Sequence, residues 1–299
     1  MEALARKEEL IEIKSNLKKQ QRQLFVHRFF ANKLAVIGLG ILILLLLLII
    51  IGPFIISHDP YEMVVDDRLV GPSSAHLLGT DNFGRDLLSR IIYGAKVSMG
   101  VGFSVAAIAS IIGMMMGLYA SYYRMLDNVL MRICDGIIAF PAILLAIALM
   151  AAIGPSTKNV IIALSVVYIP YVARVVRSAA LVVREETYIE AMKAQGASSQ
   201  RIIWHHIAPN TLSPLIVQAT FIFANAIIIE AALSFLGAGV PAPDPSWGNI
   251  LYDGKMVIFN AWWMVVFPGI CIMLSVLGLN LFGDGLRDIL DPHTNQAKK

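Results

Sequence analysis

The stretch LAVIGLGILILLLLLIIIGPFII (residues 34–56) carries no charged side chain over 23 residues. About 20 apolar residues in a helix are enough to cross the hydrocarbon core of a bilayer. The composition agrees, because 57% of the 299 residues are hydrophobic and only 15% are charged, whereas a soluble domain carries about 25% charged residues. The stretch therefore predicts a transmembrane helix. We expect it to be retained as a signal anchor, because a long polar segment precedes it and no small-residue cleavage site follows.

Five further apolar runs have comparable character. The predicted fold class is an all-α, polytopic membrane protein with six transmembrane helices. Their expected positions are 34–56, 99–122, 137–153, 160–180, 212–236 and 262–283.

Lys and Arg residues set the predicted orientation, since they are enriched on the cytoplasmic side of membrane proteins. With the N-terminus inside, 18 of the 24 basic residues lie on the cytoplasmic side and six on the other. Both termini are therefore predicted to lie in the cytoplasm. The protein itself is predicted to be a multi-pass protein of the cell (inner or plasma) membrane. The net charge of +3 is too small to indicate a nucleic-acid partner.

This orientation divides the chain into segments. Residues 1–33 form a cytoplasmic segment, which is either an amphipathic helix on the membrane surface, with Leu10, Ile13, Leu17 and Leu24 on one face, or partly disordered. The first transmembrane helix (34–56) and an extracytoplasmic segment (57–97) follow. A core of five transmembrane helices (98–291) contains a polar loop at 187–208, and 292–299 form a C-terminal tail.

Motifs for chemistry on bound groups are missing from the sequence. It has no GxxxxGK[ST] phosphate loop, no HExxH and no GxSxG. His205 and His206 are adjacent, so they diverge by about 100° on a helix, and Cys134 and Cys271 lie far apart in apolar runs. We expect no catalytic residue, no metal site and no cofactor in this chain.

The polar stretch TYIEAMKAQGASSQRIIWHHIAPN (187–210) has the signals of two short helices around a turn. Thr187 and Glu190 fit a capping box, and Gly196 occupies the position of a left-handed residue after a helix. Ser198 or Ser199 can cap the second helix, which Pro209 is expected to stop. Such defined caps favour a rigid docking element over an ordinary linker.

The run Glu190, Ala191, Met192, with Gly196 after it and Pro209 at its exit, resembles the EAA loop of ABC-importer permeases. Met192 is larger than the small residue usual in that family, so altered packing is expected at the contact. Four other stretches resemble the C-type subunit of the dipeptide/oligopeptide/nickel branch, and the likeness covers about 20–292. They are HLLGTDNFGRDLLSRIIYGAKVSMGVG (76–102), RICDGIIAFPAILLAI (132–147), LSFLGAGVPAPDPSWGNIL (233–251) and LRDILDP (286–292).

The resemblance implies a type I ABC-importer permease with several partners. These are a second, homologous permease subunit, two cytoplasmic ATPase subunits that bind ATP and Mg, and an extracytoplasmic substrate-binding protein. The implied substrate is a peptide, with oligopeptide ahead of dipeptide and nickel as the alternative within the family. An ion-coupled secondary transporter is the rival from another class, but it needs intramembrane ion sites and often inverted repeats. The implied ATPase-coupling residues are Glu190, Ala191, Met192, Gly196, Ala197 and Arg201.

The segment GTDNFGRD (79–86) is expected to form a rigid support that receives the binding protein. Asp81 favours an Asx-type turn, while Gly79 and Gly84 permit unusual backbone angles. Arg85 is expected to pair with Asp81 or Asp86, and a calcium site is an alternative that lacks EF-loop spacing. The candidate docking residues are Asp81, Arg85, Asp86 and Trp247.

Candidates for the translocation path are Glu230, Asn225, Pro141 and Tyr168. An unpaired acid in a membrane costs roughly 2.5–3.5 kcal/mol or more. Glu230 therefore either has a structural partner or lines the path. Asp135 is expected to pair with Arg132. The small residues Ala109, Gly113, Gly117 and Ser121 follow one helix face, which packs either within the bundle or against a second subunit.

Overall fold

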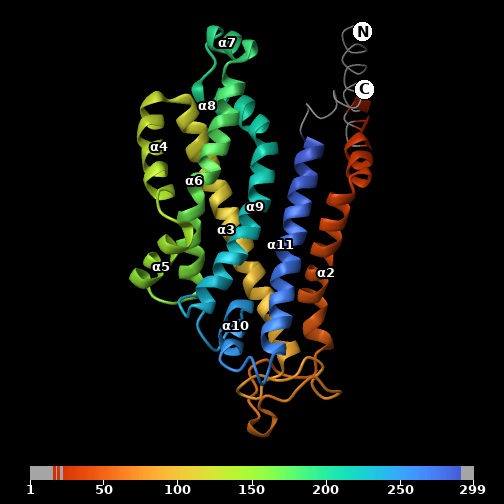
Figure 1. The fold of residues 1–299 in the computed structure, drawn as a ribbon. Helices are drawn as coiled ribbons and strands as arrows, with labels where there is room; N and C mark the ends of the chain where they lie inside the picture. Colours follow the sequence, from red (N-terminus) through yellow and green to blue (C-terminus); the bar gives the residue numbers. More distant parts are fainter. Residues whose placement is uncertain (1–15, 18, 21–22, 291–299) are drawn as a thin grey trace.

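The computed structural model describes residues 16–17, 19–20 and 23–290, and within them it consists of helices and loops without a β-sheet (Figure 1). Five long helices form the bundle: α2 (Lys33–Ile55), α3 (Leu87–Tyr122), α6 (Thr157–Arg184), α9 (Ala208–Phe235) and α11 (Trp263–Leu290). The shorter helices are η1 (Val65–Asp67), α4 (Arg124–Ile138), α5 (Ala142–Ile153), α7 (Thr187–Ala194), α8 (Ser199–Arg201), η2 (Ile202–Ile207) and α10 (Trp247–Lys255).

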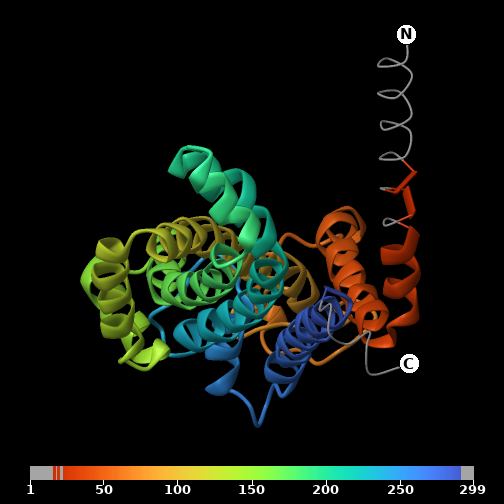
Figure 2. The ribbon, with the colours of Figure 1, turned by 90° about the horizontal axis from the view of Figure 1, so that it is seen from above.

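The predicted spans match this architecture in number if one broken span is counted. Five helical stretches are long and apolar enough to cross a membrane, and the bent pair α4–α5 makes a sixth. Figure 2 looks down the bundle and shows α4 and α5 on one side, α2 and α11 on the other, and α3, α6 and α9 between them. Helix α7 lies at one end of the bundle, and α10 with the loop after α2 lies at the other (Figure 1).

The third predicted span is not a single straight helix. Helices α4 and α5 meet at 93°, and Pro141 is the N-cap of α5. Proline lacks a backbone N–H and disfavours the α-helical conformation in the residue before it, so the chain turns here. The prediction of one helix over 137–153 is wrong, because the span is broken at Pro141. Helix α6, in contrast, continues through Pro170.

Helix α3 also starts earlier than the second predicted span, 99–122. The helix begins at Leu87, well before the predicted position 99, because the Asp86 side chain accepts a 2.8 Å hydrogen bond from the Ser89 backbone N–H. A side-chain acceptor at this position satisfies a backbone donor that the helix leaves free. The first turns of α3 therefore fall inside the segment 57–97 that was expected to precede the core.

Small residues let α3 pack closely against α6. A Cβ atom at Gly113 would lie 2.5 Å from the Val172 Cβ, and one at Gly117 would lie 2.6 Å from the Ala173 carbonyl oxygen. Backbones that approach this closely gain van der Waals contact in a membrane, where the hydrophobic effect between helices is missing. Of the two alternatives for this row of small residues, contact within the bundle is the one observed.

Helix α2 packs closely on α11 in a similar way, and most of the surface of α2 is exposed. A Cβ at Gly38 would lie 2.5 Å from the Phe282 backbone nitrogen. Many of the large apolar side chains of α2 are exposed, as expected for a helix that faces lipid. Of the N-terminal segment, residues 23–31 are helical, while Leu10, Ile13 and the tail 292–299 lie outside the described residues.

Candidate functional site

Helix α7 projects from one end of the bundle, and four of the six predicted coupling residues are exposed there (Figure 1). Met192 and Ala197 are half-buried. The exposed four are Glu190, Ala191, Gly196 and Arg201. The structure therefore brings the predicted set together as one protruding surface.

A tight turn ends α7 and fixes the direction of the chain. Gly196 has a φ of +77°, as predicted, and its N–H donates to the Lys193 carbonyl oxygen at 3.0 Å. The Ala197 N–H donates to the Met192 carbonyl oxygen, also at 3.0 Å. This pair of bonds is the Schellman arrangement, which satisfies carbonyl groups that a helix end leaves free.

The start of α7 and the exit of the loop differ from the prediction. Glu186 is the N-cap of α7 without a side-chain cap bond, so the expected capping box of Thr187 and Glu190 is not formed. Ser198 caps α8, but again without a side-chain bond. Pro209 does not stop the second helix, because α8, η2 and α9 run on as one helical stretch, Ser199–Phe235.

The segment η2 explains how the helix passes Pro209. It is a π-helical turn in which the Ala208 N–H donates to the Ile203 carbonyl oxygen. Widening the turn lets the chain continue although Pro209 supplies no N–H donor. The side chains of Ile189 in α7 and of Ile202, Ile203 and Ile207 are fully buried in the core shared with α3 and α6. Helix α7 is thus anchored in the bundle by its inner face.

Sequence reasoning missed Tyr119, which connects the end of α3 to this loop. Its hydroxyl oxygen lies 3.4 Å from the Trp204 Nε1, which donates to it, and 3.3 Å from the Gln200 Nε2. The rings of Tyr119 and Trp204 meet edge to face. No local sequence signal predicts this contact, because its partners are far apart along the chain.

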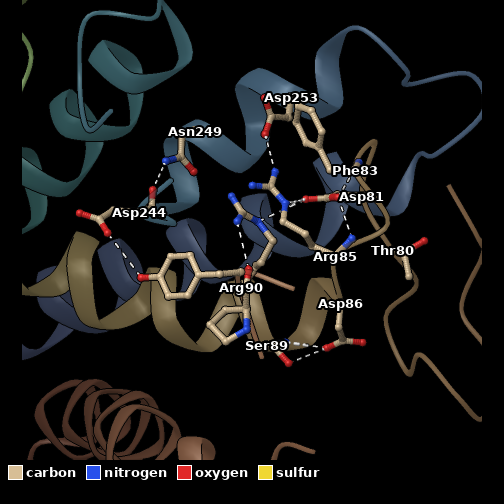
Figure 3. A network of polar contacts seen from close by, with 12 residues as sticks. Thr80, Asp81, Phe83, Arg85, Asp86, Ser89, Arg90, Asp244, Asn249 and Asp253 are labelled. Carbon is tan, nitrogen blue, oxygen red and sulfur yellow. Dashed lines mark hydrogen bonds and ion pairs between the residues drawn. The ribbon is translucent and has the colours of Figure 1, made fainter. Parts of the chain in front are cut away.

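At the opposite end of the bundle, the shoulder (residues 57–86) is held by a buried charge network (Figure 3). Asp81 accepts a 2.6 Å hydrogen bond from the Arg85 Nε and lies 3.4 Å from the Arg90 Nε. Arg85 also donates to Asp253 of α10 at 3.4 Å. Burial raises the pKa of Asp253, and the charges of Arg85 and Arg90 oppose that shift. The network fastens the shoulder to α3 and α10.

The turn inside the shoulder is formed as the glycines predicted. Gly79 and Gly84 have φ values of +82° and +77°. The Asp81 side chain accepts from the Phe83 N–H at 2.8 Å, which is the expected Asx-type turn. A Cβ at Gly84 would lie 1.8 Å from the Val64 carbonyl oxygen, so only glycine fits this position.

Burial changes the interpretation of the four docking candidates. Asp81, Arg85 and Asp86 are at most 5% exposed, and Trp247 is fully buried. The Trp247 indole Nε1 donates to the Ile91 carbonyl oxygen at 3.1 Å. In this conformation none of the four presents its side chain to a partner, and their observed contacts hold the shoulder and α10 in shape.

Glu230 has hydrogen-bonding partners within the bundle in this conformation. It is fully buried, and its two carboxylate oxygens accept hydrogen bonds from Ser98 at 2.9 Å and Ser234 at 2.8 Å. The Trp247 N–H donates in turn to the Ser98 hydroxyl, at 3.2 Å. Of the two alternatives for Glu230, the structural one agrees with this geometry.

The other three path candidates have different surroundings. Asn225 is exposed on α9, and its amide donates only to the Phe221 carbonyl of its own helix, at 2.8 Å, in the described part of the chain. Tyr168 is largely buried beside Tyr171. Pro141 is exposed at the α4–α5 break. The structure does not gather these residues into one site.

Two ion pairs join α4 to α6 near the α7 end. Asp135 pairs with Arg174 and Asp127 with Arg177. The expected pairing of Asp135 with Arg132 is therefore wrong. The partners of Asp135 and Asp127 come from a neighbouring helix, which spacing within one helix cannot indicate.

Comparisons with known proteins agree with this arrangement. Residues 109–296 match the family model described as binding-protein-dependent transport system inner membrane component. Residues 20–72 match the N-terminal TM domain of oligopeptide transport permease C. The methionine ABC transporter MetNI, in an inward-facing crystal form, has a chain with a TM-score of 0.57 and 21% identity that covers 68% of this chain and 97% of its own length.

Curated relatives are similar over nearly the whole chain. A dipeptide transport system permease protein of Alkalihalophilus pseudofirmus is 51% identical over 87% of this chain and 86% of its own. A putative peptide transport system permease protein of Brucella abortus is 49% identical, covering 91% and 90%. The dipeptide transport system permease protein of Escherichia coli is 44% identical, covering 92% and 94%. This chain belongs to the binding-protein-dependent transport system inner membrane components, as an ABC-importer permease of the peptide family.

Proposed function

We propose that this permease is one half of the path of an ATP-driven peptide importer and that α7 is its coupling helix. The chain would pair with a homologous permease subunit. Two ATPase subunits would supply ATP, Mg and the hydrolysis, and a binding protein would deliver the substrate. The chain itself contributes no bond-making residue to the cycle.

The projecting α7 carries this proposal. Its outer face, with Glu190 and Ala191, is exposed, while Ile189 on its inner face is anchored in the bundle core. The Gly196 turn and the unbroken helix from Ser199 to Phe235 connect it to the membrane core. Because α7 is held at both ends, a movement of a bound partner would move α9 as well. A flexible loop in the same place would absorb that movement.

The proposed orientation places the α7 end in the cytoplasm, with both termini, and the shoulder and α10 outside. The distribution of Lys and Arg supports it. Because Asp81, Arg85 and Asp86 are buried while Glu62, Asp66 and Arg68 of the shoulder are exposed, the binding protein would contact the shoulder outside the Asp81–Arg85 network. Figure 1 shows that α7 and the shoulder lie at opposite ends of the bundle, as this division requires.

We propose a short peptide as the substrate. The names of the relatives include di- and tripeptides, and the family model matched by residues 20–72 names oligopeptide transport; all of them support peptide over nickel. The binding protein would select the peptide before the permease contacts it. The preference for peptide length is therefore tested with the assembled importer, binding protein included.

Cross-linking tests the coupling role directly. Ala191→Cys places a thiol on the exposed face of α7, and Phe259→Cys places one at a fully exposed position at the other end of the molecule. In membranes that contain the whole importer, a cross-linker with one maleimide and one photoreactive group should join the Ala191→Cys chain to an ATPase subunit. The Phe259→Cys chain should not form that product.

The outcome that contradicts the proposal is equally concrete. If Phe259→Cys joins the ATPase subunit and Ala191→Cys does not, the orientation is inverted. If both variants assemble with the ATPase but neither joins it, α7 is not the contact. ATP hydrolysis that is stimulated by binding protein with a dipeptide, and is lost after the Ala191→Cys cross-link, completes the test.

A further inference from the structure

Three potential metal ligands meet within the shoulder, at the α10 end of the bundle and apart from the Asp81–Arg85 network. One nitrogen each of His58 and His76 and one carboxylate oxygen of Asp86 lie within 4.8 Å of one another. We propose that these residues bind one divalent transition-metal ion of the zinc type. The proposal is independent of the transport role.

The ligand atoms have nearly the separations that such an ion needs. Zinc bonds to histidine nitrogen and carboxylate oxygen at about 2.0–2.2 Å, so ligand atoms on one ion lie within roughly 4.4 Å of each other. The His76 Nδ1 and the Asp86 Oδ1 are 3.0 Å apart. The His58 ring is exposed and its centroid is 4.9 Å from that of His76, so a small rotation of His58 completes the set.

A second layer of contacts supports each ligand. A metal-binding histidine usually directs its other ring nitrogen to a carboxylate, and the His76 Nε2 lies 3.8 Å from the Asp67 Oδ2. The other Asp86 oxygen, Oδ2, accepts from the Ser89 N–H and lies 2.8 Å from the Ser89 hydroxyl oxygen. This leaves the Asp86 Oδ1 for the ion.

Ser89 also positions the third ligand. Its hydroxyl oxygen lies 3.0 Å from the His58 carbonyl oxygen, so the His58 backbone is held beside the start of α3. His58 and Asp86 both line a groove of about 530 Å³ between α2 and α3, and the exposed His58 side chain leaves the ligands accessible from solvent. The groove and the exposed ring of His58 leave room for a water molecule as the fourth ligand.

The chemistry of the ligands selects the class of ion. Two imidazoles and one carboxylate suit zinc, copper, nickel or iron, whereas magnesium and calcium prefer oxygen ligands throughout. Binding requires the His76 Nδ1 to release the hydrogen that it shares with Asp86, and Nε2 then carries a hydrogen toward Asp67. The step is a change of tautomer and ligand, without a redox reaction.

The position suggests what the ion does. His58 follows α2, Asp86 caps α3, and His76 lies in the shoulder between them. One ion on all three would tie the exit of α2 to the start of α3. The expected effect is a stiffer shoulder, resistant to proteolysis between α2 and α3.

Zinc titration of the full-length chain in detergent, after removal of metals, tests the proposal. Calorimetry and elemental analysis should find one Zn²⁺ per chain in the wild type. His58→Ala removes an exposed ligand and should weaken binding by at least 100-fold. His205→Ala, an exposed histidine at the other end, is the matched control and should bind as the wild type does.

Asp67→Asn tests the second layer, and a loss of about 10–100-fold in affinity is expected for such a partner. X-ray absorption of the zinc-loaded chain should show two imidazole ligands. Absence of saturable zinc binding in the wild type, or equal binding by His58→Ala and His205→Ala, would overturn the proposal. Unchanged affinity in Asp67→Asn would overturn the assignment of the His76 Nδ1 as the ligand atom.

Discussion

The Ser98 hydroxyl of α3 donates a 2.9 Å hydrogen bond to the Glu230 carboxylate of α9, and both side chains are completely buried. Through Ser98 the same carboxylate is connected to the first residue of α10, Trp247. An acid within a membrane span is thus satisfied by hydroxyl groups from neighbouring elements. The Glu230 carboxylate, which would be unfavourable in a membrane without partners, therefore connects α3, α9 and α10 through hydrogen bonds.

Replacing Glu230 should therefore affect stability first. Glu230→Ala leaves the Ser98 and Ser234 hydroxyls without their acceptor, at a cost of about 1–3 kcal/mol for each buried group. We expect a lower midpoint of thermal unfolding in detergent. Asn225→Ala is the control from the same helix, because its side chain is exposed and bonds to its own helix. An equal loss of stability in both variants would contradict the structural role of Glu230.

The close approach of α3 and α6 predicts opposite effects for two glycines of α3. Gly117→Ala should destabilise the bundle, since its Cβ would lie 2.6 Å from the Ala173 carbonyl oxygen. Gly100→Ala has open space around its Cβ and should stabilise the helix by up to about 1 kcal/mol. Thermal unfolding of the two purified variants measures the difference. A Gly117→Ala variant at least as stable as the wild type would show that the helices can separate at no cost.

The turn after α7 needs a left-handed residue and no extra room. A Cβ at Gly196 meets nothing within 4 Å, so the strain of Gly196→Val comes from its φ of +77° alone and costs about 1–3 kcal/mol. Asn tolerates this conformation better than valine does. In vesicles that hold the importer, Gly196→Val should take up less peptide per ATP hydrolysed, and Gly196→Asn should stay close to the wild type. Equal peptide uptake per ATP hydrolysed in both variants would show that coupling does not require a left-handed residue at position 196.

Two carboxylates of the shoulder network should differ sharply in importance. Asp81→Asn leaves Arg85 and Arg90 without their central buried partner, and breaking a buried pair costs about 3–5 kcal/mol. Asp253→Asn should cost far less, because Asp253 contacts Arg85 only at 3.4 Å and is less buried. Limited proteolysis of residues 57–86 reports the outcome. Equal protection in the two variants would contradict this ranking.

The raised pKa of Asp253 adds a dependence on pH. Burial, opposed by Arg85 and Arg90, lifts it above the ordinary value of 3.8, so the folded chain binds this proton more tightly than the unfolded chain does. Stability from this group is therefore greatest at low pH and declines as pH rises through the raised value. Relative to Asp253→Asn, the wild type should lose thermal stability as the pH rises above the ordinary aspartate value of 3.8. A parallel pH profile in both would contradict the shift.

Hydropathy predicted most of the fold because lipid leaves few alternatives to apolar helices. It failed where a boundary depends on distant partners. The start of α3 at Leu87 follows from the Asp86 cap, and charged residues such as Arg90 can lie inside the helix because Asp81 pairs with them. The break at Pro141 was detectable only as a proline, whose effect differs from that of Pro170 in α6.

The candidate sites divide in the same way. Gly196 was predicted correctly, since a glycine after helix-forming residues is a local signal. The continuation past Pro209 was not, because the π-helical turn depends on buried isoleucines packing against α3 and α6. Asp81 and Arg85 were interpreted as docking residues, which requires exposed side chains, as most charged residues have. Asp81 and Arg85 are buried because they contact each other, Arg90 and α10. A sequence pattern around residues 79–86 does not show these contacts with other elements.

The broken span also bears on how the chain enters the bilayer during synthesis. Helix α5 has 12 residues and extends about 18 Å, less than the roughly 30 Å of hydrocarbon that a spanning segment must cross. As it leaves the ribosome, α5 is therefore a poor substrate for independent insertion. It packs on α6, the next segment to be synthesised. Because α6 (Thr157–Arg184) follows α5 in translation, we expect the α4–α5 pair to reach its final position in the membrane together with α6.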